Sequence, residues 1–93
     1  MNFGTYTKQP AEFLDYDLVY GEWLPEGDAI LSTVVTVEPA TDLSVDAVFV
    51  SSPVIKLWLS GGANGTTYKL TLTTTTDAGR IKQDEFKLKV KDL

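Results

Sequence analysis

The sequence contains no cysteine and no histidine among its 93 residues. Without these two residue types the chain cannot form a disulfide, a thiol nucleophile, a Cys/His zinc site or a Ser-His or Cys-His catalytic pair. A Ser-Lys or carboxylate mechanism stays formally possible. We therefore expect a protein that is not an enzyme, with no catalytic residue, no metal and no cofactor.

Long apolar runs are also absent, and no segment approaches the length that spans a membrane. Residues 1–5 show no basic region followed by an apolar run, so we expect no signal peptide and synthesis in the cytoplasm. The formal net charge is −5, which argues against non-specific binding to nucleic acid.

The charge is unevenly placed along the chain. Residues 1–50 hold nine acids and one lysine, whereas residues 51–93 hold four acids and seven bases. Such asymmetry can steer oriented association, including head-to-tail contact between copies of the chain. Chance clustering on a soluble surface is the alternative, and pairing of distant strands would cancel the polarity.

Most of the chain alternates between apolar and polar residues with a period of two, the pattern of a strand with one buried face. The clearest case follows the glycine-rich turn at residues 61–65, where Tyr68, Leu70 and Leu72 point to one side. In the expected strand at residues 44–51, Val45, Ala47 and Phe49 should share one face, opposite Asp46, Val48 and Val50. The pattern predicts strands over residues 12–18, 29–37, 44–51, 54–59, 68–75 and 80–90.

These short strands predict a single immunoglobulin-like β-sandwich of about six to seven strands over residues 11–93. Tyr68 lies where such folds place a tyrosine whose hydroxyl bonds to backbone upstream, and Trp58 is a candidate core tryptophan. Residues 1–10 are polar and end at Pro10, so we expect an extended amino-terminal arm that orders only on assembly. Phe3 and Tyr6 would be its apolar contacts with a partner.

Acidic residues gather at Asp15, Asp17, Glu22, Glu26 and Asp28. Hard cations bind such oxygens, but no calcium-loop spacing is present, and the pattern favours a solvated strand face. The threonines at 71 and 73–76 are likewise interpreted as strand formers on a wet face rather than as a row of ligand-binding hydroxyls.

Two further groups are candidate partner contacts. Tyr20 and Trp23 lie in a turn rich in glycine and proline. If their rings are exposed, they would anchor a partner. If the rings instead fold over the end of the sandwich, their role is structural. Lys87, Lys89 and Lys91 alternate with apolar residues near the carboxyl terminus. We interpret them as protection of an edge strand, with contact to an acidic partner as the alternative.

Several short motifs in order resemble a family of small tailed-phage proteins, the fiber–tail adaptor family. The resemblance covers nearly the whole chain from Lys8 onward and supplies no catalytic residues. Its motifs are Lys8-Gln9-Pro10-Ala11-Glu12, Leu14-Asp15-Tyr16-Asp17, Trp23-Leu24-Pro25, Gly27-Asp28, Trp58-Leu59-Ser60-Gly61-Gly62, Gly65-Thr66-Thr67-Tyr68 and Gly79-Arg80.

The resemblance implies an immunoglobulin-like virion component, made in the host cytoplasm, that bridges tail and fiber proteins. Its partners would be other phage structural proteins of the tail, fiber, portal-proximal region or capsid, and copies of itself, with no nucleic acid and no membrane. Two alternatives stay open. One is a capsid decoration protein, and the other is a carbohydrate-binding module that uses Trp23 or Tyr20 to stack on host glycans.

Overall fold

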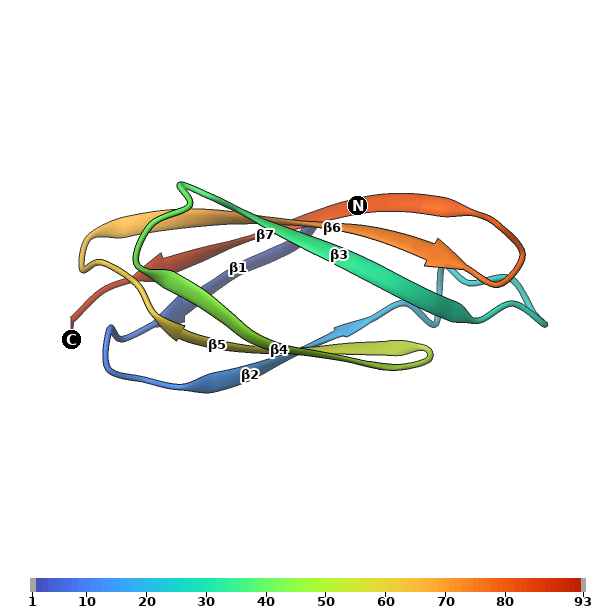
Figure 1. Cartoon of the computed structure of the whole chain (residues 1–93), viewed down its shortest axis with the longest axis horizontal. Coiled ribbons are helices and arrows are strands. Elements are labelled where there is room, and N and C mark those ends of the chain that lie inside the picture. Colours follow the sequence, from blue (N-terminus) through green and yellow to red (C-terminus); the bar gives the residue numbers. More distant parts are fainter. Residues whose placement is uncertain (1, 93) are drawn as a thin grey trace.

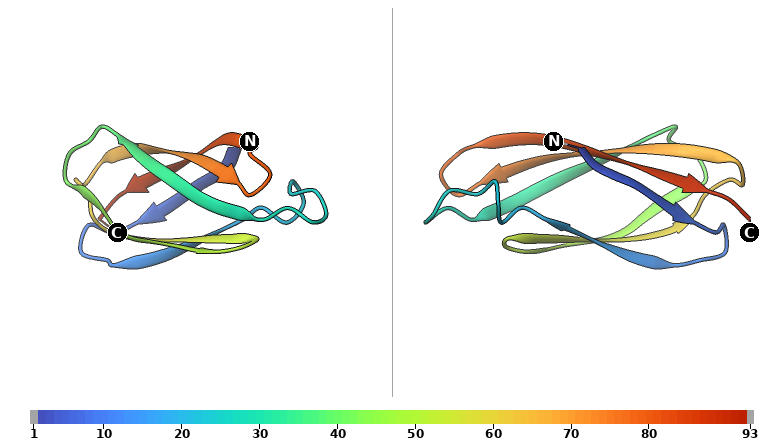
Figure 2. Two further views of the ribbon diagram at one scale, coloured as in Figure 1. Left: turned by 45° about the vertical axis from the view of Figure 1, so that its right-hand side comes forward. Right: turned by 180° about the vertical axis from the view of Figure 1, so that it is seen from behind.

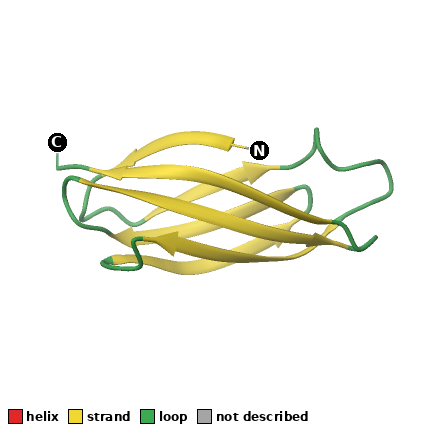
Figure 3. Cartoon of the chain, turned by 90° about the horizontal axis from the view of Figure 1, so that it is seen from above, coloured by secondary structure: helices red, strands yellow, loops and turns green. Residues whose placement is uncertain are grey.

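The computed structural model describes residues 2–92, and the side chains of residues 4–92. Every regular element in this part of the chain is a strand, which confirms the predicted all-β class. Figure 3 shows the strands running the length of the molecule, with the loops at its two ends. The strands are β1 (Asn2–Lys8), β2 (Leu14–Val19), β3 (Ile30–Glu38), β4 (Leu43–Ser51), β5 (Val54–Gly61), β6 (Thr66–Thr76) and β7 (Ile81–Val90).

The strands form two sheets that pack face to face (Figure 1). One sheet has four strands in the order β1-β7-β6-β3, and the other has three in the order β2-β5-β4. Pairing is antiparallel throughout, except that β1 runs parallel to β7. The molecule is elongated, with principal extents of 43 × 19 × 18 Å.

The core lies between the sheets and consists of alternate residues of the long central strands, as the period of two predicts. Each of these side chains contributes about 1.5–3 kcal/mol through removal of its apolar surface from water. The central members, all at most 1% exposed, are Ile55, Leu57 and Leu59 of β5, Tyr68, Leu70 and Leu72 of β6, and Phe86, Leu88 and Val90 of β7.

Tyr68 makes the backbone contact expected of it. Its buried hydroxyl accepts a hydrogen bond of 2.9 Å from the backbone N–H of Ala63, five residues upstream. This bond fixes the turn between β5 and β6 against the start of β6.

The predicted grouping of side chains on β4 is wrong. A bulge between Val45 and Ala47 shifts the register, so that Val45 pairs with Leu59 but Ala47 pairs with Trp58. A bulge inserts one residue and therefore exchanges the two faces beyond it. Ala47 and Phe49 consequently face outward, whereas Val48 and Val50 share the side of Leu57 and Ile55.

Trp58 is not a core residue, contrary to expectation. It alternates with the fully buried Leu57 and Leu59 and so lies on the outward face of the three-stranded sheet. There its neighbours across the strands are Asp15 on β2 and Ala47 on β4.

The amino-terminal segment also differs from the expected free arm. Residues 2–8 are extended but paired, and they form the edge strand β1 along β7 (Figure 2, right). Tyr6 packs against the core, with its ring centroid 5.3 Å from that of Tyr16 and 5.5 Å from that of Phe86. The side chain of Phe3, the other expected anchor, lies outside the described residues.

Lys8 attaches this strand to the opposite sheet. Its side chain is buried, and its ammonium donates to the carbonyl of Gly61 at the end of β5 (2.6 Å), as well as to those of Gln9 (2.8 Å) and Pro10 (3.3 Å). Burial lowers the pKa of Lys8 from its ordinary value, while the nearby charge of Glu12 acts in the opposite direction. The three carbonyl bonds compensate for the removal of the ammonium from water.

Asp28 joins two loops at the other end of the molecule. One carboxylate oxygen accepts from the backbone N–H groups of Ala29 (2.9 Å) and Ala78 (3.1 Å), and the other lies 2.8 Å from the Arg80 guanidinium. Desolvation alone would raise the pKa of Asp28, but hydrogen bonds from Thr76, Ala78, Ala29 and Arg80 together lower it.

We predict that Lys8→Met lowers the free energy of unfolding by roughly 1–3 kcal/mol, because buried carbonyls lose their donor while the aliphatic stem is kept. Lys89→Met, which removes an exposed ammonium from the outward face of β7, is the control and should change stability by less than about 0.5 kcal/mol. Urea denaturation of the two variants measures the difference. Equal stability of both variants would show that the Lys8 contact carries no net energy.

We also predict that Asp28 makes stability depend on acid pH. Its pKa in the folded state is below the ordinary value of 3.8, so its contribution is fully present above that pH and is lost as the pH falls through the folded pKa. Asp28→Asn should therefore flatten the fall in melting temperature below that pH. Asp77→Asn in the adjacent turn is the control, and a curve for Asp28→Asn that parallels the wild type would contradict the prediction.

Candidate interaction surfaces

The outward face of the three-stranded sheet carries an ion-paired cluster. Lys56 on β5 lies 3.3 Å from Asp15 and 3.8 Å from Asp17 on β2. All three side chains are about half exposed, and such surface pairs contribute at most about 1 kcal/mol each. Among residues 2–92 no group of three or more acids, cysteines or histidines is arranged to hold a metal ion. The half-exposed Asp15 and Asp17 fit the expected solvated strand face, whereas the Asp28 side chain is almost fully buried.

An aromatic pair lies on the same face. The rings of Phe13 and Trp58 are 5.3 Å apart and tilted by 35°, and Phe13 is 56% exposed. Phe49 follows in the next row of the sheet, opposite Lys56, and is 58% exposed. We call Phe13, Trp58 and Phe49 the aromatic face. Sequence reasoning missed it, although the alternation of Trp58 with the leucines of β5 carried the signal.

Tyr20, expected as a possible surface contact, is fully buried and offers no ring to a ligand. The Tyr20 hydroxyl accepts a 3.4 Å hydrogen bond from the Thr74 hydroxyl and also hydrogen-bonds to the buried carboxylate of Asp84. The Thr74 hydroxyl is in turn 3.0 Å from the hydroxyl of Thr33. Burial raises the pKa of Tyr20 to about 12, reinforced by the charge of Asp84 and opposed by the bond from Thr74.

Trp23 is half-buried and folds over the end of the core, as one of its two interpretations predicts. Its ring packs edge-on against Tyr20 at 6.3 Å, and the Lys82 ammonium lies 5.2 Å from its centroid. Lys82 also pairs with Asp84 at 3.2 Å. The tryptophan thus covers a buried polar network rather than standing free as an anchor.

Lys87 and Lys89 face outward, but the interpretation as edge protection is wrong for them. β7 lies between β1 and β6 and is therefore an internal strand. Lys91 follows the end of β7 and is exposed. With Lys69 on β6, these lysines give one end of the four-stranded sheet a basic outward surface.

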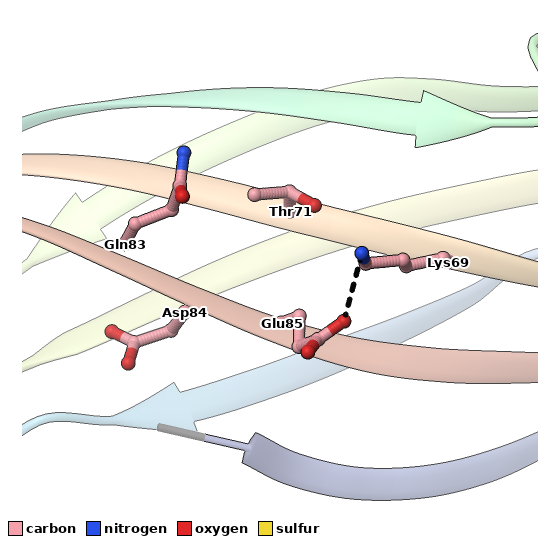
Figure 4. Close-up of a pocket in the computed structure, with 5 residues that line it drawn as sticks. All are labelled: Lys69, Thr71, Gln83, Asp84 and Glu85. Carbon is pink, nitrogen blue, oxygen red and sulfur yellow. Dashed lines mark ion pairs between the residues drawn. The ribbon is translucent and has the colours of Figure 1, made fainter.

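Beside these lysines the surface is polar over the middle of β6 and β7, while the apolar Val34 and Ile81 are exposed elsewhere on it. Figure 4 shows Lys69 paired with Glu85 (3.4 Å) beside Thr71 and Gln83, at a shallow depression of about 150 Å³. Asp84, on the same strand as Glu85, points away from the pair. The expected wet threonine row is only partly exposed, because Thr74 and Thr76 are buried while Thr71, Thr73 and Thr75 face outward.

Charge therefore differs between the sheets. The strands of the four-stranded sheet contain five lysines and three acids, whereas those of the three-stranded sheet contain one lysine and three acids. The polarity seen along the sequence survives in part, because β2 and β4 come from the acidic half and β6 and β7 from the basic half.

These observations define a small all-β protein of two packed sheets whose exposed chemistry lies on faces suited to contact with other macromolecules. The chain belongs to the family described as podophage GP4 fiber-tail adaptor protein gp77, whose model matches residues 8–89. That description is of a structural component of the phage tail. No curated protein matches the chain. No helix of residues 2–92 is long and apolar enough to cross a membrane.

Proposed function

We propose that this protein is a non-enzymatic adaptor that joins a tail protein to a fiber protein in the phage virion. The observation that carries the proposal is the difference in chemistry between the two outward faces. One bears the aromatic face and a surplus of acids, and the other bears threonines and lysines. A bridging protein needs two surfaces that do not compete for the same partner.

The fold that presents these faces is proposed to be immunoglobulin-like. The orders β2-β5-β4 and β7-β6-β3 match the BED and GFC strand orders of that fold, with β1 beside the last strand. The bond from Ala63 to Tyr68 at the start of β6 matches the tyrosine corner. Such a sandwich leaves both outward faces open because all core contacts lie between the sheets.

A glycan-binding function is the second candidate, and the observation that favours it is the exposed Phe13 packed on the half-buried Trp58 beside Asp15. Stacked rings with a neighbouring carboxylate suit a sugar ring. The aromatic face, rather than the buried Tyr20 or the half-buried Trp23, would then be the platform.

The adaptor function predicts that each face is needed for a different partner. In phage lacking the native copy, Phe13→Ser with Trp58→Ser should remove one neighbouring virion protein from purified particles, and Lys87→Glu with Lys89→Glu should remove another. The controls are Ile81→Ser, which changes an exposed apolar residue of the other sheet, and Lys87→Arg with Lys89→Arg, which keeps the charge. Quantitative mass spectrometry of the particles is the measurement.

The same experiment separates the alternatives. Complete particles that no longer adsorb to the host after the aromatic substitutions would favour glycan binding. Immunogold labelling of the head instead of the tail would favour capsid decoration. If particles that carry the protein with both pairs of substitutions have normal composition, the bridging function is contradicted.

A further inference from the structure

One side of the molecule presents two edge strands with exposed apolar side chains. β3 ends the four-stranded sheet, β4 ends the three-stranded sheet, and the two strands lie in contact (Figure 1). The exposed residues are Leu31 and Val34 on β3 and Val48, Phe49 and Val50 on β4. The packing of the two sheets leaves this strip uncovered.

These two edges lack the usual protection. An edge strand exposes unpaired N–H and C=O groups, and proteins guard it with lysines, prolines or bulges. β3 and β4 contain no lysine, arginine or proline, and their only charges are Glu38 and Asp46. β4 has a bulge at Val45–Ala47, but beyond it the strand pairs regularly with β5 up to Ser51.

The second half of β4 has apolar side chains on both faces. Phe49 faces outward and is 58% exposed, while Val48 and Val50 point toward the core side but remain 38% exposed. A strand placed beside β4 would pair its backbone and cover both faces at once, because successive side chains of a strand alternate between faces.

The charges near the β4 edge indicate which kind of strand would pair with it. β4 itself carries no positive group, and Asp46 on β4 and Asp42 just before it are both acidic and exposed. The lysine nearest in register, Lys56 opposite Phe49, is already paired with two aspartates of β2. A second copy would bring the same acids and a further net charge of −5. An incoming strand that combines apolar residues with lysine or arginine would be complementary.

We propose that residues 47–51 of β4 accept, by strand addition, an extended apolar and basic segment of a second virion protein. The proposal rests on the adaptor function and specifies how one partner is held. This contact differs from one through the aromatic face, because backbone hydrogen bonds along the β4 edge would provide the affinity. The side chains of β4 would determine only which sequence is accepted.

The test uses the isolated, isotope-labelled protein and synthetic eight-residue peptides. A peptide of alternating lysine and valine should slow hydrogen exchange of the amides of residues 47–51, whereas an alternating glutamate–valine peptide should not. The lysine–valine peptide with an N-methyl group on every residue has no N–H donor on either edge, cannot form a regular ladder with β4 and should fail as well. Phe49→Ser should weaken binding by about tenfold, and Ile81→Ser, which removes an exposed side chain of β7, should not.

Absence of binding, protection at other strands, or equal binding of the N-methylated peptide would overturn the proposal. A free protein that sediments as a dimer with β4 already protected would also overturn it, because a second copy would then occupy the edge. Particle composition tests the adaptor function separately. If that test fails while the peptide still adds to β4, the edge site stands and the bridging function falls.

Discussion

The contact between the Lys8 ammonium and the Gly61 carbonyl is the constraint on which one whole end of the structure depends. It joins β1 of one sheet to β5 of the other in a chain that has no disulfide to do so. The glycines make the approach possible. Gly61 has φ of 75°, and a Cβ there would lie 2.5 Å from the Asp42 carbonyl oxygen, while a Cβ on Gly62 would lie 2.7 Å from the Val90 side chain. A side chain at Gly61 would displace the backbone of Asp42 before β4, and one at Gly62 would displace Val90 at the end of β7.

Sequence alone predicted the strands and the core well, because both follow from a period of two that each strand carries within itself. It failed where the outcome depends on distant residues. β1 was missed because Lys8 occupies an inward position, and its burial depends on the carbonyl of Gly61, 53 residues away, as well as on those of Gln9 and Pro10. The faces of β4 were reversed after Val45 because nothing in the local pattern marks the bulge.

The interaction surfaces were harder to predict because they depend on the order of strands in each sheet. Lys87 and Lys89 belong to the last strand of the sequence, yet that strand is internal because the first strand adds beside it. The real edges on the opposite side, β3 and β4, come from the middle of the chain. Tyr20 was expected at the surface from its turn-like neighbours, but partners on β6 and β7 hold it in the interior.

Several of the residues that carry the family resemblance close the ends of the fold, whereas others, Asp15, Asp17 and Trp58, lie on the outward face of the three-stranded sheet. Gly27-Asp28 meets Gly79-Arg80 through the 2.8 Å ion pair, Lys8 meets Gly61, and Tyr68 holds the backbone of Ala63. These contacts are internal and do not involve Phe49, Lys87 or Lys89, which face outward and lie outside the motifs in the sequence. Because Phe49, Lys87, Lys89 and the β4 edge take no part in end closure, these positions can change to fit different partners while the two-sheet framework is kept. The chemistry of the faces and of the edge, rather than the internal contacts, therefore determines which partners fit.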